Sequence, residues 1–312
     1  MDISMGIRNK ASVMGYRVRA LFRYERMTVR PREKRFLSQN GLDTFAAIYG
    51  LDGGTAVADS SSSSVERFVL RDGNDRRIVY VKKYWFLSPS RLWKGMLRGT
   101  FLRRSKVKRE YGFLLQLAQS GLEAAAPIAW GEQRIARWLL RSFLVTEGIT
   151  RPMPMDEFIA ETLPGMPEAE RRWARRALLR ALAQCTRRFH DHGFVHHDLY
   201  WRNIILSEGR LDRFFIIDGP KGRRCRPWES RRCRAKDLAT LDAPAPLFFR
   251  RTERLRFFLF YSGTSRLTPA TKRFVQTILR HAGPERDRQG RRLLGDEYGL
   301  RCGESSSGLC KS

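Results

Sequence analysis

The sequence predicts an α+β protein of two lobes, in which a small β-rich lobe with one main helix is followed by a larger helical lobe. Strand-like segments and a single long helical pattern come first, and helical patterns with one short strand pair between them come afterwards. The chain has 312 residues, 42% of them hydrophobic, which is enough for a two-lobed domain with a proper core. We expect a ligand cleft where such lobes meet.

The first lobe is predicted over residues 41–148. β-branched and aromatic residues favour strands at residues 44–49, 67–70, 77–84, 127–131 and 142–146. Asp72-Gly73 and Asn74-Asp75 are turn signals that favour a hairpin between the second and third of these strands. A short helix is predicted at 91–98 and a longer one at 104–120, where apolar residues recur on one face until Gly121 ends the helix.

The second lobe is predicted over residues 149–282 and is mostly helical. Its clearest helix covers 168–190, because Leu178, Leu182 and Phe189 recur at helical spacing with arginines on the opposite face. The remaining elements are two brief apolar strands at 204–206 and 214–217 and three helices at 231–241, 250–261 and 270–281. Residues 1–40 are expected to form a basic appendage, and residues 283–312 a loose polar tail.

The net charge of +28, from 60 Lys and Arg against 32 Asp and Glu, indicates that the protein works beside something negatively charged. Nucleic acid, an anionic membrane and a phosphorylated substrate all fit this charge. We expect no nucleic-acid partner, because no signature of a helix-turn-helix, an RRM or a zinc finger accompanies the basic residues. The Arg-rich, acid-poor N-terminus also fits a mitochondrial presequence on composition alone.

The cysteines and the apolar segments indicate the compartment. The five cysteines are odd in number and contain no C-x-x-C pair, which argues against a disulfide framework or a zinc ribbon and for a reducing environment. No run of about 18 apolar residues occurs, and the N-terminus lacks the apolar stretch of a secretory signal. We therefore expect a chain that neither spans a membrane nor is exported by that route.

The most informative segment, residues 194–206, contains the pattern H-x-D-x-x-x-x-N, formed by His196, Asp198 and Asn203, and Asp218 follows at the end of a second apolar strand. Phosphoryl transfer explains this arrangement. One carboxylate must orient or deprotonate the acceptor hydroxyl, while an amide and a second carboxylate hold Mg²⁺ on the phosphates of ATP. Asp198 fits the first role, and Asn203 and Asp218 fit the second. Alternatively, the three residues cap loops and strand ends.

A strand lysine completes the predicted nucleotide site. Residues 79–82 match the V-A-I-K pattern, whose lysine grips the α and β phosphates, and the match selects Lys82 over Lys83. The expected partner of Lys82 is Glu110, the only acidic residue in 106–120. The alternatives are a solvated edge charge for Lys82 and a surface i,i+4 pair of Glu110 with Lys106.

Through these residues and their neighbours, the sequence resembles the lipopolysaccharide kinase (Kdo/WaaP, InaA-like) family over about residues 65–262. The most specific match is the segment 190–206. Supporting matches lie at residues 81–84, 108–111, 143–147, 216–218 and 234–238. The resemblance implies a protein-kinase-like fold and an enzyme that uses ATP and Mg²⁺ to phosphorylate a sugar, a heptose or Kdo unit of the lipopolysaccharide inner core or of a related glycolipid.

The resemblance also implies individual roles. Lys82 and Glu110 would position ATP, Glu147 would lie in the hinge that contacts adenine, and Asp237 would brace the catalytic loop from a later helix. Alternatively, Asp237 is an ordinary helix residue paired with a neighbouring Arg. An enzyme of this kind would work at the cytoplasmic face of the inner membrane, where basic residues among 1–40 would bind anionic lipid reversibly. Two runner-up interpretations are an atypical protein kinase and a catalytically silent kinase-like binding module.

Two positions depart from the pattern of regulated protein kinases. His197 replaces the arginine before the catalytic aspartate, and Gly219 replaces the phenylalanine after the metal-binding one. Both changes favour an enzyme that is active without phosphorylation of its activation loop. Histidines at 190, 192, 196 and 197 raise the question of a zinc site, but they span a helix end and a loop, so hydrogen-bonded or catalytic-loop histidines are the preferred interpretation.

Overall fold

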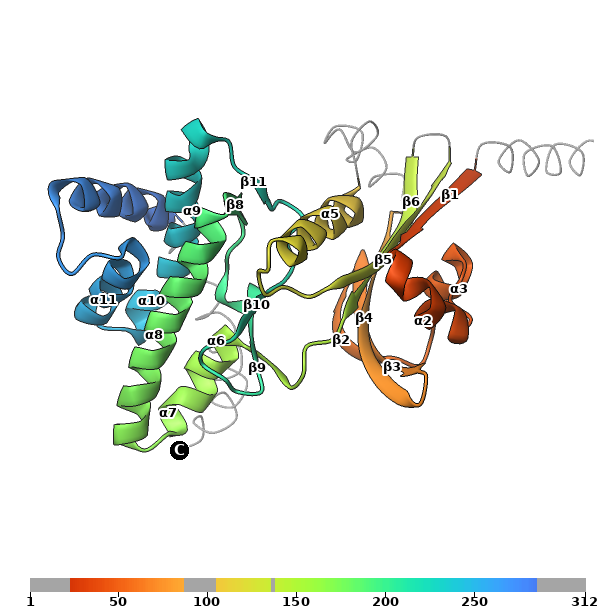
Figure 1. Ribbon diagram of the computed structural model, residues 1–312, viewed down its shortest axis with the longest axis horizontal. Helices are drawn as coiled ribbons and strands as arrows, with labels where there is room; N and C mark the ends of the chain where they lie inside the picture. Colours follow the sequence, from red (N-terminus) through yellow and green to blue (C-terminus); the bar gives the residue numbers. More distant parts are fainter. Residues whose placement is uncertain (1–22, 87–104, 136–137, 285–312) are drawn as a thin grey trace, which may run out of the picture. The chain divides into compact units, whose positions relative to one another are not determined.

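The computed structural model describes residues 23–86, 105–135 and 138–284, which form two compact units (Figure 1). The first unit draws on Met1–Gln119 and Ala125–Ile149, and the second on Ser120–Ala124 and Thr150–Ser312. The helix predicted at 91–98 lies outside the described residues. None of the helices in the described ranges has the length and apolar character needed to cross a membrane.

A six-stranded antiparallel sheet, with strand order β1-β5-β6-β4-β3-β2, organises the first unit. Its strands are β1 (Arg23–Val29), β2 (Thr55–Ser60), β3 (Ser63–Asp72), β4 (Asp75–Trp85), β5 (Pro127–Ile135) and β6 (Trp138–Glu147). β3 and β4 form the predicted hairpin, with Asp72 opposite Asp75 at its turn. The predictions for 67–70, 77–84, 127–131 and 142–146 are therefore confirmed.

Helices cover both faces of this sheet. The helices are α2 (Lys34–Gln39), α3 (Phe45–Tyr49) and α5 (Lys106–Gln119), preceded by a 3-10 turn at Pro31–Glu33. Figure 1 shows α2 and α3 on one face and α5 on the other. Successive side chains of a strand point to opposite faces, and Val79 and Val81 of β4 point into the core beneath α2 and α3. Helix α5 confirms the long helix predicted at 104–120.

The strand predicted at 44–49 is wrong, because these residues form helix α3. Thr44 caps the helix, since its hydroxyl oxygen accepts a hydrogen bond of 3.1 Å from the amide of Ala47. Phe45 and Ile48 lie three residues apart, so both fall on the face that packs into the core. The cap and this spacing outweigh the strand preference of the aromatic and β-branched residues.

The basic appendage predicted over residues 1–40 is wrong for residues 23–40. β1 pairs with β5 along its whole length, from Arg23 opposite Ile135 to Val29 opposite Ala129. Helix α2 buries Phe36 and Leu37 in the core. The prediction failed because this segment contains many arginines and only a few apolar side chains that anchor it in the core. Residues 1–22 lie outside the described part of the chain.

The second unit is built mainly of helices, as predicted. They are α6 (Met155–Glu157), α7 (Leu163–Gly165), α8 (Glu168–Asp191), α9 (Ser230–Asp242), α10 (Ala245–Phe248), α11 (Arg251–Ser262), a π-helical turn at Phe158–Thr162, 3-10 turns at Trp201–Asn203 and Pro227–Glu229, and a helix over residues 269–284. The helices predicted at 168–190, 231–241, 250–261 and 270–281 are confirmed.

Two small sheets position the segment between α8 and α9. One has the order β10-β9-β7, and in the other β11 pairs with β8. Their strands are β7 (Pro152–Pro154), β8 (Phe194–Val195), β9 (Ile204–Ser207), β10 (Phe214–Ile216) and β11 (Arg223–Arg224). The indole of Trp201 donates a hydrogen bond of 3.0 Å to the carbonyl of Leu241 at the end of α9. The loop from β8 to β9 is thereby anchored to α9.

Candidate active site

The structure brings Asp198, Asn203 and Asp218 into one neighbourhood. Asn203 precedes β9 directly, and its side-chain amide donates a hydrogen bond of 2.9 Å to the carbonyl of Asp198. β9 pairs with β10, and just beyond that pair the amide of Ile217 donates to the carbonyl of Asn203 at 3.0 Å. Asp218, the next residue, therefore leaves the sheet beside Asn203.

His196 links the two ends of this neighbourhood. Its Nε2 donates a hydrogen bond of 3.0 Å to the carbonyl of Ile217, which precedes Asp218. Non-glycine residues with positive φ in the described chain include His197, at 66°, and Asp218, at 55°. This left-handed backbone is costly for residues with a side chain and is found preferentially at functional sites. The positive φ of His197 sets the direction in which the chain enters Asp198, and that of Asp218 sets the direction of the chain that follows.

Asp237 holds the backbone before Asp198 from helix α9. Its Oδ2 accepts from the amide of His196 at 2.7 Å, and its Oδ1 accepts from the amide of His197 at 2.8 Å. The predicted brace between Asp237 and the catalytic loop is confirmed. Two amides on one carboxylate fix the orientation of the loop and satisfy donors that would otherwise be buried without a partner.

A chain of hydrogen bonds supports Asp237. Burial raises the pKa of Tyr261 to about 12, so its hydroxyl keeps its proton and donates to Nδ1 of His190 at 2.9 Å. Nε2 of His190 then donates to Asp237 Oδ2 at 3.3 Å. Burial alone would raise the pKa of Asp237, but the hydrogen bond from His190 and the amide of His196 outweigh it and hold that pKa below its ordinary value. Both ring nitrogens of His190 thus take part in this series of hydrogen bonds.

Lys221 meets the carboxylate of Asp198, a contact that sequence reasoning missed. Its Nζ lies 2.8 Å from Oδ2 and 3.0 Å from Oδ1 of Asp198, and its side chain is 62% exposed. A signal was present, because Lys221 stands three residues after Asp218 in Asp-Gly-Pro-Lys. Gly219 and Pro220 turn the chain back, and this turn allows the ammonium group to reach Asp198.

Lys82 and Glu110 form the predicted ion pair within the first unit. Lys82 Nζ lies 3.5 Å from Glu110 Oε2, and the Glu110 side chain on α5 is only 4% exposed. Lys83 points to the opposite face of β4, where its ammonium group bonds the carbonyl of Leu51 and lies 3.3 Å from Glu66. Of the two adjacent lysines, Lys82 is therefore the one that meets Glu110.

Glu147 does not join Lys82. In the sheet Glu147 pairs with Val79, so the two side chains share the face opposite to that of Lys82. Its carboxylate lies 3.3 Å from the guanidinium of Arg77, and its amide donates to the carbonyl of Ala126 at 2.8 Å. The contact of Glu147 with adenine stays a prediction.

Comparison with known proteins agrees with this geometry. Residues 57–254 match the model of the lipopolysaccharide kinase (Kdo/WaaP) family. A lipopolysaccharide core heptose(I) kinase WaaP from Escherichia coli is 27% identical over 138 residues, which are 43% of this chain and 51% of that protein. The match thus spans about half the length of that relative. The lipopolysaccharide core heptose(I) kinase WaaP of Pseudomonas aeruginosa is 26% identical over 228 residues, which are 71% of this chain and 81% of that protein.

A solved structure supports the fold. The structure described as WaaP in complex with acyl carrier protein superposes with a TM-score of 0.56 at 24% identity, covering 84% of this chain and 98% of that one. The predicted α+β, protein-kinase-like fold is confirmed. Because the family model covers well over half of the sequence, including all residues from Lys82 to Asp237 discussed above, the chain belongs to the lipopolysaccharide kinase (Kdo/WaaP) family.

Proposed function

We propose that the protein transfers the γ-phosphoryl group of ATP to a hydroxyl of a heptose or Kdo unit in the lipopolysaccharide core or a related glycolipid. The observation that carries this proposal is the pair of hydrogen bonds that join Asn203 to Asp198 and to Ile217, the residue before Asp218, within the segment matched by the family model. The names of the relatives, both heptose(I) kinases, support the sugar acceptor.

The donor set fits Mg²⁺. The side-chain nitrogen of Asn203 is committed to the carbonyl of Asp198, so its oxygen is the atom left to face a ligand. Together with the carboxylate of Asp218, it offers the hard oxygen atoms that Mg²⁺ prefers. Bound Mg²⁺ would neutralise charge on the phosphates of ATP as the phosphoryl group leaves.

Asp198 would orient the acceptor hydroxyl and take its proton. Its carboxylate projects from a loop that Asp237 fixes through two amides, so the oxygen atoms are presented in one orientation. Lys221 now holds that carboxylate, and we propose that it swings to the transferred phosphoryl group when the acceptor binds Asp198. In the first unit, Lys82 would grip the α and β phosphates while Glu110 holds its ammonium group in place.

The deciding experiment compares Asp198→Asn with the unchanged enzyme, using labelled ATP and either lipopolysaccharide core acceptors or protein substrates. A positioned acid-base residue contributes about 10² to 10⁴ fold, so the variant should lose turnover on the sugar by about that factor. Label on protein but not on sugar would identify an atypical protein kinase. Equal background turnover by the unchanged protein and Asp198→Asn would identify a silent binding module, and failure of the unchanged protein to bind Mg·ATP in a calorimeter would contradict the enzyme assignment.

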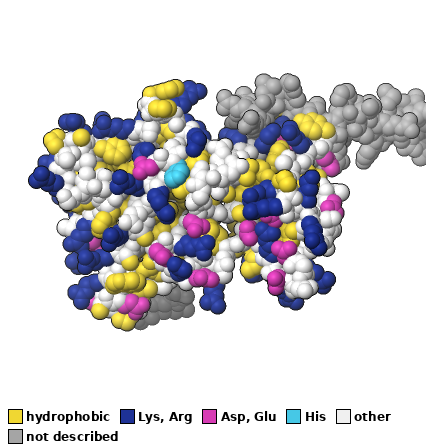
Figure 2. All heavy atoms as spheres, in the orientation of Figure 1, with side chains coloured by type: hydrophobic (Ala, Val, Ile, Leu, Met, Phe, Trp, Pro, Cys, Tyr) yellow, Lys and Arg dark blue, Asp and Glu magenta, His cyan; other side chains and the backbone are white. Residues whose placement is uncertain are grey.

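We also propose that the protein works peripherally at the cytoplasmic face of the inner membrane. Its net charge of +28 suits an anionic lipid surface, and Figure 2 shows many Lys and Arg side chains on the face that it presents. Acyl carrier protein is a second candidate partner, because the related WaaP structure was solved in complex with it. Size-exclusion chromatography with purified acyl carrier protein tests this partner, and separate elution at low salt would exclude it.

A further inference from the structure

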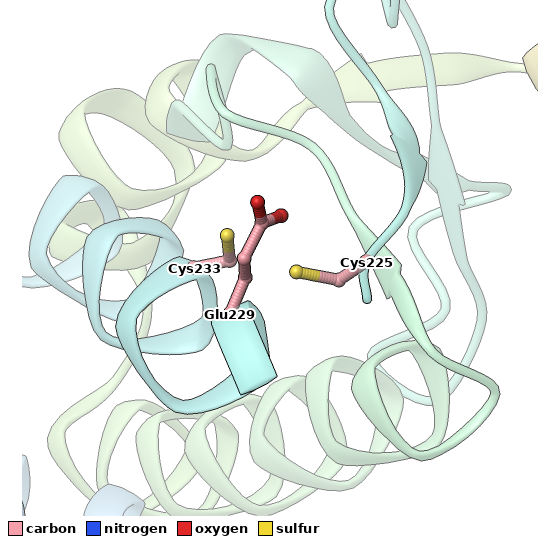
Figure 3. Close-up of side chains that lie close together, drawn as sticks. All are labelled: Cys225, Glu229 and Cys233. Atoms are coloured by element: carbon pink, nitrogen blue, oxygen red, sulfur yellow. The ribbon is translucent and has the colours of Figure 1, made fainter. Parts of the chain in front are cut away.

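Two cysteines and a glutamate that the proposed phosphoryl transfer does not use gather at the start of α9. Cys225 follows β11, Glu229 ends the 3-10 turn Pro227–Glu229, and Cys233 lies in the first turn of α9. Their ligand atoms all lie within 4.8 Å of one another. Figure 3 shows Glu229 and Cys233 projecting from neighbouring turns while Cys225 reaches toward them from the strand side.

The spacing of these atoms is close to that of a metal site. In a tetrahedral zinc site with bonds of about 2.0 to 2.3 Å, neighbouring donor atoms lie about 3.3 to 3.8 Å apart. Glu229 and Cys233 are four residues apart, so their side chains emerge on one side of the helix start. We propose that Cys225, Glu229 and Cys233 bind a thiophilic divalent cation of the zinc type, with the fourth position open to water.

The surrounding charge is compatible with this cation. Two thiolates and one carboxylate around a divalent ion leave one negative charge, and Arg223 lies beside it. The guanidinium of Arg223 is 2.7 Å from Glu229 Oε2 and 3.8 Å from the sulfur of Cys233. Each carboxylate has two oxygen atoms, so Glu229 can keep Arg223 on one and bind the metal through the other.

A redox role for the same two cysteines would leave one donor unused. A disulfide takes only the two sulfur atoms, so the third donor, Glu229, would have no part in it. A bound divalent cation uses all three donors and deprotonates a coordinating thiol outright.

The metal would connect elements that shape the candidate active site. β11 pairs with β8, the strand directly before His196, and α9 carries the brace Asp237. Cys225 belongs to the chain that runs from Asp218 to α9. A cation held by Cys225 on one side and by Cys233 on the other would therefore fix this connecting segment to α9.

The test is a Co²⁺ titration of the full-length protein carrying Cys302→Ser and Cys310→Ser, because these two cysteines lie outside the described residues and could bind metal themselves. The expected result is one equivalent of Co²⁺ with a thiolate-to-cobalt charge-transfer band, displaced by Zn²⁺. Mg²⁺ sites built from oxygen atoms give no such band, and neither ATP nor acceptor is present. The measurement is therefore independent of the proposed phosphoryl transfer.

Variants locate the site. Loss of a residue that merely supports a ligand costs about 10 to 100 fold in metal affinity, so Cys225→Ser and Cys233→Ser should each cost on the order of 100 fold or more and weaken the band. Glu229→Gln should lower the affinity but keep the band. Cys185→Ser, on α8, is the matched control and should change nothing. The proposal is overturned if the parent protein shows no band, if Cys225→Ser keeps both the full intensity of the band and the parent's affinity for Co²⁺, or if the band depends on Cys185.

Discussion

Asp237 is the residue on which the geometry of the catalytic loop depends most directly. It is fully buried, and it accepts hydrogen bonds from two amides and from His190. Asp237→Asn keeps the size but turns one acceptor into a donor that faces a backbone amide. Breaking a buried charged network costs about 3 to 5 kcal/mol, and we expect a loss near the lower end in the free energy of unfolding, measured by urea denaturation at pH 7.

The same variant tests the pKa of Asp237. Because this pKa lies below its ordinary value of 3.8 in the folded protein, the carboxylate stabilises the fold fully above about pH 4. The contribution is lost as the pH falls through the folded pKa. The difference in unfolding free energy between the unchanged protein and Asp237→Asn should thus be constant from about pH 5 to 8 and shrink below about pH 4. A difference that widens on acidification would contradict this assignment.

Lys221 allows chemistry and stability to be separated. Its ion pair with Asp198 is exposed on the lysine side, and such pairs contribute about 0 to 1 kcal/mol to stability. Lys221→Met should therefore leave the melting temperature nearly unchanged while it lowers kcat, by on the order of 10 to 100 fold, if the ammonium group meets the phosphoryl group in the transition state.

Arg210→Met is the matched control for Lys221→Met. Arg210 forms an exposed ion pair with Asp212 in the connection between β9 and β10, so it shares the charge and the exposure of Lys221 without touching Asp198. Equal kcat values for the two variants would show that Lys221 takes no part in phosphoryl transfer.

At the scale of elements, β4 places two adjacent lysines on opposite faces of the sheet. Lys82→Met should raise the KM for ATP and lower kcat, so that kcat/KM falls by on the order of 100 fold. The reason is that the α and β phosphates would lose the ammonium group that Glu110 positions. Lys83→Met should instead lower the free energy of unfolding by about 1 to 3 kcal/mol, since Glu66 and the carbonyl of Leu51 lose a buried partner. ATP titration and urea denaturation of both variants check this, and the reverse assignment of effects would refute it.

The elements that the sequence predicted are those with strong local signals. The hairpin of β3 and β4 has paired turn residues, α5 and α8 have an uninterrupted apolar face, and the segment around Asp198 carries its chemistry in its own residues. Helix α3 was missed because five residues are too few to show a helical period, and its clearest local signal is a single cap at Thr44. β1 was missed because its partner β5 follows about 100 residues later, and no local pattern reports such pairing.

In the candidate site, too, the residues with a local sequence pattern were predicted, and the contacts that depend on the fold were missed. Asp198, Asn203, Asp218, Lys82 and Glu110 were predicted because their types and spacing reflect the chemistry of phosphoryl transfer. Lys221 was missed, since its contact depends on how Gly219 and Pro220 turn the chain after Asp218. The cluster of Cys225, Glu229 and Cys233 was missed for a similar reason, because its spacing matches no common metal motif and only the fold of β11 against α9 brings it together.

For the whole molecule, the net charge of +28 favours association with anionic surfaces. Residues 23–40 belong to the fold, so a truncation that removed all of residues 1–40 would unfold the first unit and test nothing about lipid. Residues 1–22 can be removed without touching β1. They contain four basic residues, Arg8, Lys10, Arg17 and Arg19, against one acidic residue.

Deleting residues 1–22 should weaken binding to anionic vesicles. Each basic residue near such a surface contributes about 1 kcal/mol, so the loss of four corresponds to a decrease in partitioning of on the order of 100 fold or more at low salt. The difference should shrink as added salt shortens the screening length to about 8 Å near 0.15 M. Replacing the four basic residues by Gln in the full-length chain should reproduce the effect, with Mg·ATP binding unchanged in both proteins. If both variants sediment with phosphatidylglycerol vesicles to the same extent as the unchanged protein, the folded units, rather than this segment, carry the affinity for the membrane.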